Sequence, residues 1–525
     1  MCFDPKEKKH VDTHFQAHCC PCGGFSVGEM SRRSFLGGIG GATAAGSLAF
    51  SGLSWAALSA GEKELPQAPP RQPLVVKPLL CYALPQPRPQ TSWRGWGGVQ
   101  TQEAAEKEIA RIKDELQGLQ TAADFPLTFL PLTAAKSLDE LNAAKDDLAK
   151  ADVTLVYAAD GYSLLDAVGK MAKELIIFCR HRSGPTYLWY EIVSPIFLRR
   201  RTDSLAVEGV DDWDVVIDSQ EEILWRLRAL CGLRNTIGSK IIAIGGPSGW
   251  GHPKEAPALA KERFQLDIQT VSYEELGELI KQARADQAAV QLARKRAEAY
   301  LSLPNTTLET ERKFVENAFL LEGIFRALMK RAQCRAITIN QCMGTIMPLS
   351  ETTACLSLST LNDDGYLAFC ESDFVVVPAG ILLGNISGRP QFLNDPTYPH
   401  DGVITSAHCT GPRKMDGKTL EPVRLLTHFE SDYGAAPKVE MRKGQVVTNI
   451  IPDFKAECWV GLRGEIIDAP FLPICRDQID IRLQCDSLKL AQRMPGFHWM
   501  TCYGDYLREI GYALKRTSIK WEVLG

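Results

Sequence analysis

Short apolar runs alternate with longer amphipathic stretches through the first two thirds of the chain. The runs at residues 127–132, 153–158 and 175–179 have the length of buried strands, and the stretches at 102–121 and 220–233 repeat their apolar positions as a helix face does. Strands that are buried on both faces read as continuous apolar runs. The alternation therefore predicts parallel sheets covered by helices.

The pattern changes after about residue 389. Helical periodicity fades, and short apolar segments separated by turn residues follow, for example at 403–406, 446–451 and 479–482. Such segments are typical of an antiparallel sheet or barrel. A last helix is predicted at about 506–516, where it would close the chain.

A chain of 525 residues is too long for one hydrophobic core, so several domains are expected. The predicted fold class is α/β, with two Rossmann-like parallel-sheet domains followed by a β-rich antiparallel domain. A long amphipathic helix is expected from about 307 to 332, within the second of these domains. The predicted parts are a leader with a proline-rich linker at 1–72, a first α/β domain at 73–235, a second at 236–365, and the β-rich domain at 366–525.

The leader contains Arg32-Arg33, followed by a weakly apolar run, rich in glycine and alanine, that ends near Leu58. A basic pair, a weak hydrophobic region and small residues, in this order, resemble a twin-arginine export signal. A buried Gly/Ala helix is the alternative, although glycine and serine disfavour a packed helix. The signal predicts folding in the cytoplasm, export by the twin-arginine machinery and a periplasmic location.

A segment rich in histidine and cysteine precedes the arginine pair. On a helix its three histidines would share one face, and imidazole and thiolate are the ligands that bind zinc or copper. The segment is either a solvated tail or a site of transient metal binding. Its residues are His10, His14, His18, Cys19, Cys20 and Cys22.

Charge and cysteine content narrow the classes of function. The 59 basic and 63 acidic residues give a net charge of -4, which argues against nucleic acid as the main partner. Four of the 16 cysteines lie in the first 22 residues, and the others are scattered without the regular spacing of a disulfide scaffold. Most cysteines are therefore expected to be free thiols.

Two acidic stretches are candidates for chemistry. Ser350 has the character of a helix N-cap, which would place Glu351 in the first turn, and a plain helix-start acid is the alternative there. Glu371 and Asp373 follow an apolar run and precede another, at the strand end where ligands of α/β sheets bind. A divalent cation would offset the cost of burying two carboxylates. The alternative, that one of them caps the next helix, explains one acid more easily than both.

Two further stretches have residues that could contact a ligand. The glycine-rich turn at 245–252 follows a strand, but it lacks the G-x-G-x-x-G order and contains a proline, so a nucleotide loop is not favoured. His498 lies among aromatic residues near the C-terminus. Taken alone, it would more often be a packed core histidine than a metal ligand.

In their order along the chain, the stretches at 351, 370–373 and 497–505 resemble the fucose isomerase and arabinose isomerase superfamily. That family has an acid near a helix start, a second acidic segment about two dozen residues later, then a hydrophobic helix, and a histidine near the C-terminus. The corresponding segments here are Cys370-Glu371-Ser372-Asp373, then 382–390, then Phe497-His498 followed by Tyr503-Gly504-Asp505. The resemblance covers roughly residues 240–525.

The resemblance implies an aldose–ketose isomerase that works through an enediol. It implies that Glu351, Asp373 and His498 hold Mn²⁺ or another divalent cation, with Glu351 and Asp373 as the catalytic acids and Glu371 as the alternative to Glu351. Residues expected to line the sugar pocket are Asp395, His408, His428, Trp250 and His252. It also implies a homo-oligomer, a trimer or hexamer, whose active sites form between protomers.

Two departures from the family pattern bear on these expectations. Phe497 stands where the family has a second histidine, and an export signal is foreign to its characterised isomerases. The alternative function is therefore a non-catalytic or carbohydrate-binding exported member of the same fold. Metal-dependent hydrolase or lyase chemistry at the same residues is a third possibility.

Overall fold

The computed structural model describes residues 54–59, 65–190 and 192–525. The arginine pair of the predicted export signal and the segment rich in histidine and cysteine lie outside this part of the chain. Among the described residues, no helix is both long enough and apolar enough to cross a membrane. The first described helix is the short α1 (Trp55–Ser59).

The first sheet is parallel throughout and has the strand order β2-β1-β4-β5-β6, with β3 pairing with β1. Alternate residues of its strands enter different cores. On β4, Leu155 packs into one cluster and Val156 into the other. Both faces are thus buried, as the continuous apolar runs predict. The strands are β1 (Leu74–Cys81), β2 (Leu127–Phe129), β3 (Thr133–Ala135), β4 (Val153–Ala158), β5 (Glu174–Cys179) and β6 (Val215–Ile217).

The helices that accompany this sheet are close to those predicted. The segment from Leu138 to Lys150 forms two helices that meet at Ala144, and the expected strand at 127–132 ends at Phe129. The helices are α2 (Gln102–Ala122), α3 (Leu138–Ala143), α4 (Lys145–Lys150), α5 (Tyr162–Met171) and α6 (Gln220–Thr236).

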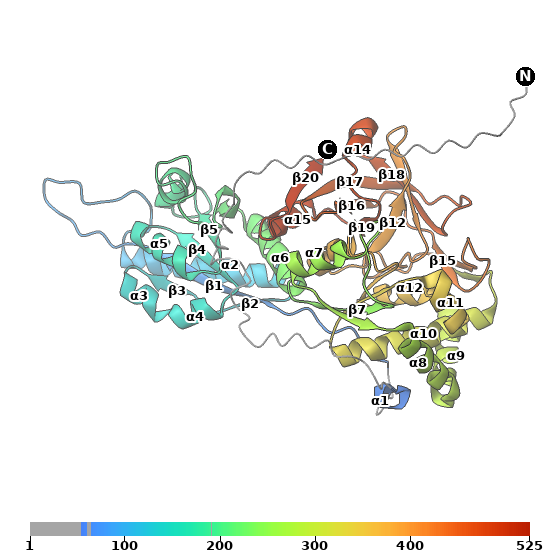
Figure 1. Ribbon diagram of the computed structural model, residues 1–525. Coiled ribbons are helices and arrows are strands. Elements are labelled where there is room, and N and C mark those ends of the chain that lie inside the picture. The colour runs from blue at the N-terminus through green and yellow to red at the C-terminus, as the bar shows by residue number, and fades with distance from the viewer. Residues whose placement is uncertain (1–53, 60–64, 191) are drawn as a thin grey trace, which may run out of the picture. The chain divides into compact units, whose positions relative to one another are not determined.

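The second sheet is also parallel, with the order β11-β10-β7-β8. On β7 (Lys240–Ile244), Ile242 and Ile244 pack against α8, α9 and α10, whereas Ile241 and Ala243 pack against α7 and α13. Figure 1 shows α7 on one side of this sheet and α8–α10 on the other. The other strands are β8 (Asp267–Val271), β10 (Ala336–Ile339) and β11 (Leu367–Phe369). The predicted boundary at residue 366 falls immediately before β11.

One helix of this part begins later than predicted. The helix expected from about 307 is α10 (Arg312–Ala332), because Thr306–Leu308 forms strand β9 instead. Strand β9 pairs in parallel with β14 (Val423–Leu426), a partner more than one hundred residues away that the local pattern cannot show. The remaining helices are α7 (Glu255–Phe264), α8 (Tyr273–Ala285), α9 (Gln287–Leu301), α11 (Met347–Ser350), α12 (Cys355–Asp363) and α13 (Val377–Ser387).

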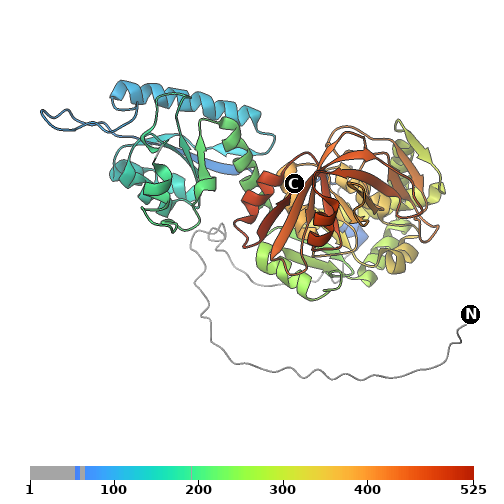
Figure 2. The same ribbon diagram turned by 90° about the horizontal axis from the view of Figure 1, so that it is seen from above.

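The last part of the chain forms a closed antiparallel barrel. Six strands pair in the ring β16-β19-β12-β13-β18-β17, and β17 pairs again with β16. The ring is drawn in orange to red in Figures 1 and 2. Its strands are β12 (Phe392–Pro396), β13 (Val403–His408), β16 (Val446–Ile451), β17 (Cys458–Asp468), β18 (Asp477–Leu483) and β19 (Trp499–Tyr503). The protein is thus a mixed α/β chain with two parallel sheets and a separate antiparallel barrel.

The chain does not end in a helix as predicted. The expected last helix is α15 (Leu507–Leu514), but β20 (Lys520–Leu524) follows it and pairs in parallel with the start of β17. Trp521 of β20 packs closely over Gly461 and Gly511, where a larger side chain would collide with its ring. Two elements complete this part, β15 (Ala436–Val439), which pairs with β14, and α14 (Ser487–Arg493).

Candidate metal centre

A cavity of about 510 Å³ lies at the carboxyl end of the second sheet. The chain leaves β7 for β8 on one side and later returns to β10 on the other. The loops after β7 and β10 therefore diverge, and ligands of α/β sheets bind in the crevice that such loops leave. The barrel closes the cavity from the other side. Lining residues include Ser248, Trp250, Gln341, Glu371, Asp373 and His408.

The turn that follows β11 has an unusual backbone. Glu371 and Ser372 both have left-handed φ angles, 68° and 48°, which cost a non-glycine residue about 1 kcal/mol or more each. Neighbouring loops fix the turn. The N–H of Ser372 donates to Thr338 Oγ1 at 3.1 Å, and the N–H of Ser248 donates to the Ser372 carbonyl at 3.1 Å. This conformation places Glu371 and Asp373 at the cavity.

The Asp373 carboxylate is almost fully occupied by hydrogen bonds within the protein. Its Oδ1 accepts from the N–H groups of Trp250 at 3.0 Å and Val375 at 3.1 Å, and its Oδ2 lies 2.6 Å from His498 Nδ1. Asp373 as a whole is only 2% exposed. Asp373 therefore closes the turn and orients the histidine, but it does not cap α13, whose N-cap position is Val376 and has no side-chain hydrogen bond.

His498 and Asp395 lie side by side at one end of the barrel. On β12 and β19, Asn394 is opposite Trp499, and continuing this antiparallel register by one residue places Asp395 opposite His498. His498 Nε2 is 3.1 Å from Asp395 Oδ1 and 3.3 Å from Glu371 Oε2. Neither Nε2 of His498 nor Oδ1 of Asp395 makes a hydrogen bond, although both atoms are buried.

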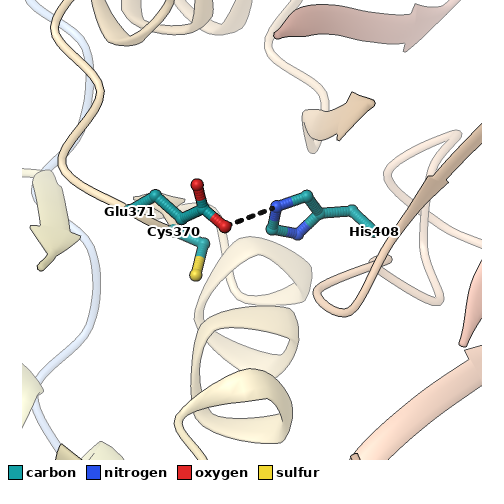
Figure 3. Close-up of side chains that lie close together, drawn as sticks. All are labelled: Cys370, Glu371 and His408. Atoms are coloured by element: carbon teal, nitrogen blue, oxygen red, sulfur yellow. Dashed lines mark ion pairs between the residues drawn. The ribbon is translucent and has the colours of Figure 1, made fainter. Parts of the chain in front are cut away.

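His408, at the end of β13, completes the cluster. Its Nε2 is 3.6 Å from Glu371 Oε1, and Figure 3 shows the Glu371 carboxylate directed at this ring. Two overlapping groups have ligand atoms that all lie within 4.8 Å of one another, Cys370, Glu371 and His408, and Asp395, His408 and His498. The two groups share His408, so donors from the second sheet and from the barrel meet around this ring.

The carboxylates of the cluster favour a positive charge at its centre. Burial lowers the pKa of His498, but the carboxylates of Asp373, Asp395 and Glu371 outweigh it and raise this pKa to about 11. Burial also lowers the pKa of His408, but Glu371 and Asp395 raise it to about 9. For Glu371, burial raises the pKa, and the two histidines more than reverse this and hold it well below its usual range.

A divalent cation fits this arrangement. The three carboxylates with both rings protonated carry a net charge of −3 + 2 = −1, and a divalent ion that replaces the two ring protons leaves the same total. Because Nδ1 of His498 faces Asp373, Nε2 is the nitrogen left to bind an ion, an arrangement common in metal sites. Carboxylate oxygens with an imidazole suit Mn²⁺ or a similar ion. Glu371 and Asp395 are candidate ligands together with His498, because each lies within 3.3 Å of His498 Nε2, and His408, which belongs to both close groups, is a fourth candidate.

The structure does not bring Glu351 to this cavity. Glu351 follows α11 with a left-handed φ of 51°, its side chain is 60% exposed, and Oε1 accepts from Arg284 at 2.7 Å. Ser350 ends that helix instead of capping the next one, because its hydroxyl donates back to the Ile346 carbonyl at 2.8 Å. The expectation of a helix-start acid here is therefore wrong, and the implied ligand set is corrected accordingly.

The other predicted pocket residues divide into two groups. Trp250 and His428 line the same cavity as Asp373, and Trp250 stacks on Phe497 with ring centroids 4.6 Å apart. Phe497, which stands in place of a histidine, thus contributes an aromatic surface. His252 does not line the cavity and lies against Phe454, 5.1 Å between ring centroids.

Two residues have a larger part in the centre than the sequence pattern indicates. Asp395 and His408 were expected only to line a pocket, but both belong to the group of possible metal ligands. A signal was available for Asp395, which lies 395 − 371 = 24 residues after Glu371. The position of His408 follows from barrel pairing, which no local pattern shows.

The chain matches none of the protein-family models and none of the curated proteins with which it was compared.

Proposed function

We propose that this chain is a metal-dependent sugar isomerase that interconverts an aldose and a ketose, with Mn²⁺ or a similar ion held by Glu371, Asp395 and His498. The observation that carries this proposal is the approach of two carboxylates to one buried imidazole nitrogen: Nε2 of His498 lies 3.1 Å from Asp395 Oδ1 and 3.3 Å from Glu371 Oε2.

The resemblance to the fucose and arabinose isomerases supports the proposal once the family pattern is assigned to a different set of acids. That pattern has one acid, a second acidic segment about two dozen residues later and a histidine near the C-terminus. Glu371, Asp395 and His498 have this order and spacing. In the proposal, Asp373 becomes a positioning residue and Glu351 has no part. The two parallel sheets would then be the Rossmann-like domains of this superfamily, followed by its β-rich domain.

The proposed reaction needs a proton to move between neighbouring carbons. The ion would polarise two adjacent sugar oxygens and so acidify the intervening C–H. A carboxylate would take the proton from C2 of the aldose while O1 gains a proton, which gives an enediol. The carboxylate would then return its proton to C1 while the O2 hydroxyl loses one, which gives the ketose. Glu371 and Asp395 are the candidates, because their side chains, 38% and 34% exposed, are the acids of the cluster that remain accessible.

The cavity can also hold a sugar. Its volume of about 510 Å³ lies within the usual range for small-molecule sites, about 300–1,000 Å³. Trp250 is 51% exposed and presents an aromatic face, and His428 and Glu430 supply polar groups. We further propose that the protein crosses the membrane folded, by the twin-arginine pathway, to act in the periplasm as a homo-oligomer.

Two substitutions that each replace an acid by its amide test the metal assignment, one in the cluster and one outside the cavity. Asp395→Asn should abolish or greatly weaken binding of Mn²⁺, because it removes a negative ligand from the cluster. Glu351→Gln should leave binding unchanged, because Glu351 pairs with Arg284 outside the cavity. Free Mn²⁺ is measured by electron paramagnetic resonance during titration of each protein. Full binding by Asp395→Asn would overturn the assignment.

The reaction is tested separately. Purified protein is incubated with a panel of aldoses with and without Mn²⁺, and ketose formation is followed by chromatography and by exchange of the C2 proton with deuterated water. Ketose formation that requires Mn²⁺ supports the isomerase. Metal binding with sugar binding but without exchange would instead indicate the carbohydrate-binding alternative.

A further inference from the structure

Five cysteines converge on the cavity, and the proposed isomerase does not use them. They come from separate segments: the loop after β10, the start of α12, the end of β11, the end of β13 and the loop before β18. The structure describes twelve free cysteines, so five of the twelve gather at this one place. They are Cys342, Cys355, Cys370, Cys409 and Cys475.

The five thiols form a row. Neighbouring thiols of this row interact in pairs: Cys370 with Cys342, Cys342 with Cys355, Cys355 with Cys409, and Cys409 with Cys475. The last three also pack together beside Ala436. A set of cysteines serving only as small apolar side chains has no reason to be collected from five segments into a continuous row along a cavity.

We infer that this row of thiols is a second binding site, which takes a soft, thiophilic cation of the Cu⁺ type. Thiolate sulfur selects such ions over hard cations. Among the described residues, neither three-membered group of close ligand atoms consists of thiols, so no compact cage of sulfurs of the kind that holds Zn²⁺ is present. Neighbouring thiols in pairs suit Cu⁺, which accepts two sulfur ligands.

Binding is balanced by proton release. Each thiol that becomes a ligand loses its proton to solvent, and the resulting thiolate donates its electron pair to the ion, without any change of oxidation state. The half-buried Cys342 and Cys475 lie at or near the two ends of the row and give the ion a route from the cavity. His428, which also lines the cavity, supplies a neutral donor on that route.

The soft site is distinct from the proposed Mn²⁺ site although the two are adjacent. Cys370 immediately precedes Glu371, and Figure 3 shows its sulfur turned away from the Glu371–His408 pair. Cys370 belongs to both donor sets, because its sulfur lies within 4.8 Å of ligand atoms of Glu371 and His408 and also interacts with Cys342. The other four thiols are in neither close group of possible metal ligands, so they offer a second donor set to a soft ion.

The test uses the full chain, reduced and kept free of oxygen. The protein is titrated with Cu⁺ in competition with a chromophoric Cu⁺ chelator, and ultraviolet absorption reports thiolate–Cu⁺ bonds. Cys355→Ser, in the middle of the row, should weaken Cu⁺ retention by at least about tenfold. Cys334→Ser is the matched control, since Cys334 is 4% exposed and Cys355 3%, but Cys334 bonds to the Ala336 carbonyl outside the cavity.

A second variant keeps the test informative even if Cys355→Ser does not fold. Cys475 is half-buried at the end of the row, so Cys475→Ser should fold and should also lose Cu⁺. Equal Cu⁺ retention by the wild type, Cys334→Ser and both cavity variants would overturn the inference, as would failure of the wild type to compete with the chelator. Mn²⁺ binding should persist in Cys355→Ser, and Cu⁺ binding in Asp395→Asn. Failure of one site is thereby distinguished from failure of the other.

Discussion

The hydrogen bond of 2.6 Å between Asp373 and His498 decides which ring nitrogen is available for an ion. Oδ1 of Asp373 already accepts two backbone N–H groups, so the whole carboxylate is held in place. With Nδ1 held by Oδ2, Nε2 is the ring nitrogen that faces Asp395 and Glu371. Asp373 thus acts through His498.

Asp373→Asn should leave the fold intact and weaken Mn²⁺ binding by about 10- to 100-fold. The amide oxygen can still accept from the N–H of Trp250, and its NH₂ group then faces Nδ1 of His498. Nδ1 must accept, so the ring proton moves to Nε2 and blocks the ligand position. Titration with Mn²⁺ measures the effect, with circular dichroism to verify folding. Wild-type affinity in this variant would contradict the positioning role.

At the scale of elements, the turn between β11 and α13 depends on β10. The N–H of Ser372 is buried, and its acceptor is the hydroxyl of Thr338, which is itself fully buried. Two successive residues of the turn have left-handed φ angles, which are strained conformations. The hydrogen bond to Thr338 helps to hold them in place.

Thr338→Val should lower the free energy of unfolding by about 1–3 kcal/mol, because it leaves a buried N–H without an acceptor at nearly constant volume. Thr338→Ser keeps the hydroxyl and is the control. The valine variant should also bind Mn²⁺ more weakly, since Glu371 and Asp373 lie on this turn. Urea unfolding and Mn²⁺ titration of both variants measure these effects, and equal stability of the two would refute the role of the contact.

The sequence predicts elements well where the signal is local. The apolar runs at 153–158 and 446–451 are strands, and the alternation with helices gives two parallel sheets. Prediction from the sequence fails where an element forms only by pairing with a distant segment. Thr306–Leu308 is a strand because β14 lies beside it. The same holds for the site. Glu371 and Asp373 could be placed at a strand end, but the partnership of Asp395 with His498 depends on barrel register.

At the scale of the whole molecule, stability should depend on pH through Asp363. Burial raises the pKa of Asp363 to about 7, and the hydrogen bond from the Lys414 N–H opposes this only in part. The ordinary value in an unfolded chain is about 4. The folded chain therefore binds more protons than the unfolded chain between these values, and the free energy of unfolding should fall as pH rises from about 4 to about 7.

Asp363→Asn removes this titration and keeps an oxygen that can accept from the Lys414 N–H. The difference in unfolding free energy between wild type and variant should therefore shift in favour of the variant as pH rises through that window. Urea unfolding at a series of pH values measures the difference. A difference that stays constant with pH would show that Asp363 has an ordinary pKa.

The ring of six barrel strands has no free edge, so Asp395, His408 and His498 are carried by one closed unit, whereas Glu371 belongs to the turn after the second sheet. An ion bound between them would link the second sheet to the barrel, which already share a hydrophobic core. Folding and loading would then be linked quantities, because an ion that binds only the assembled seam stabilises the assembled chain by mass action. Under the proposed twin-arginine export of the folded chain, the supply of metal in the cytoplasm would then govern how much of the protein is ready to leave.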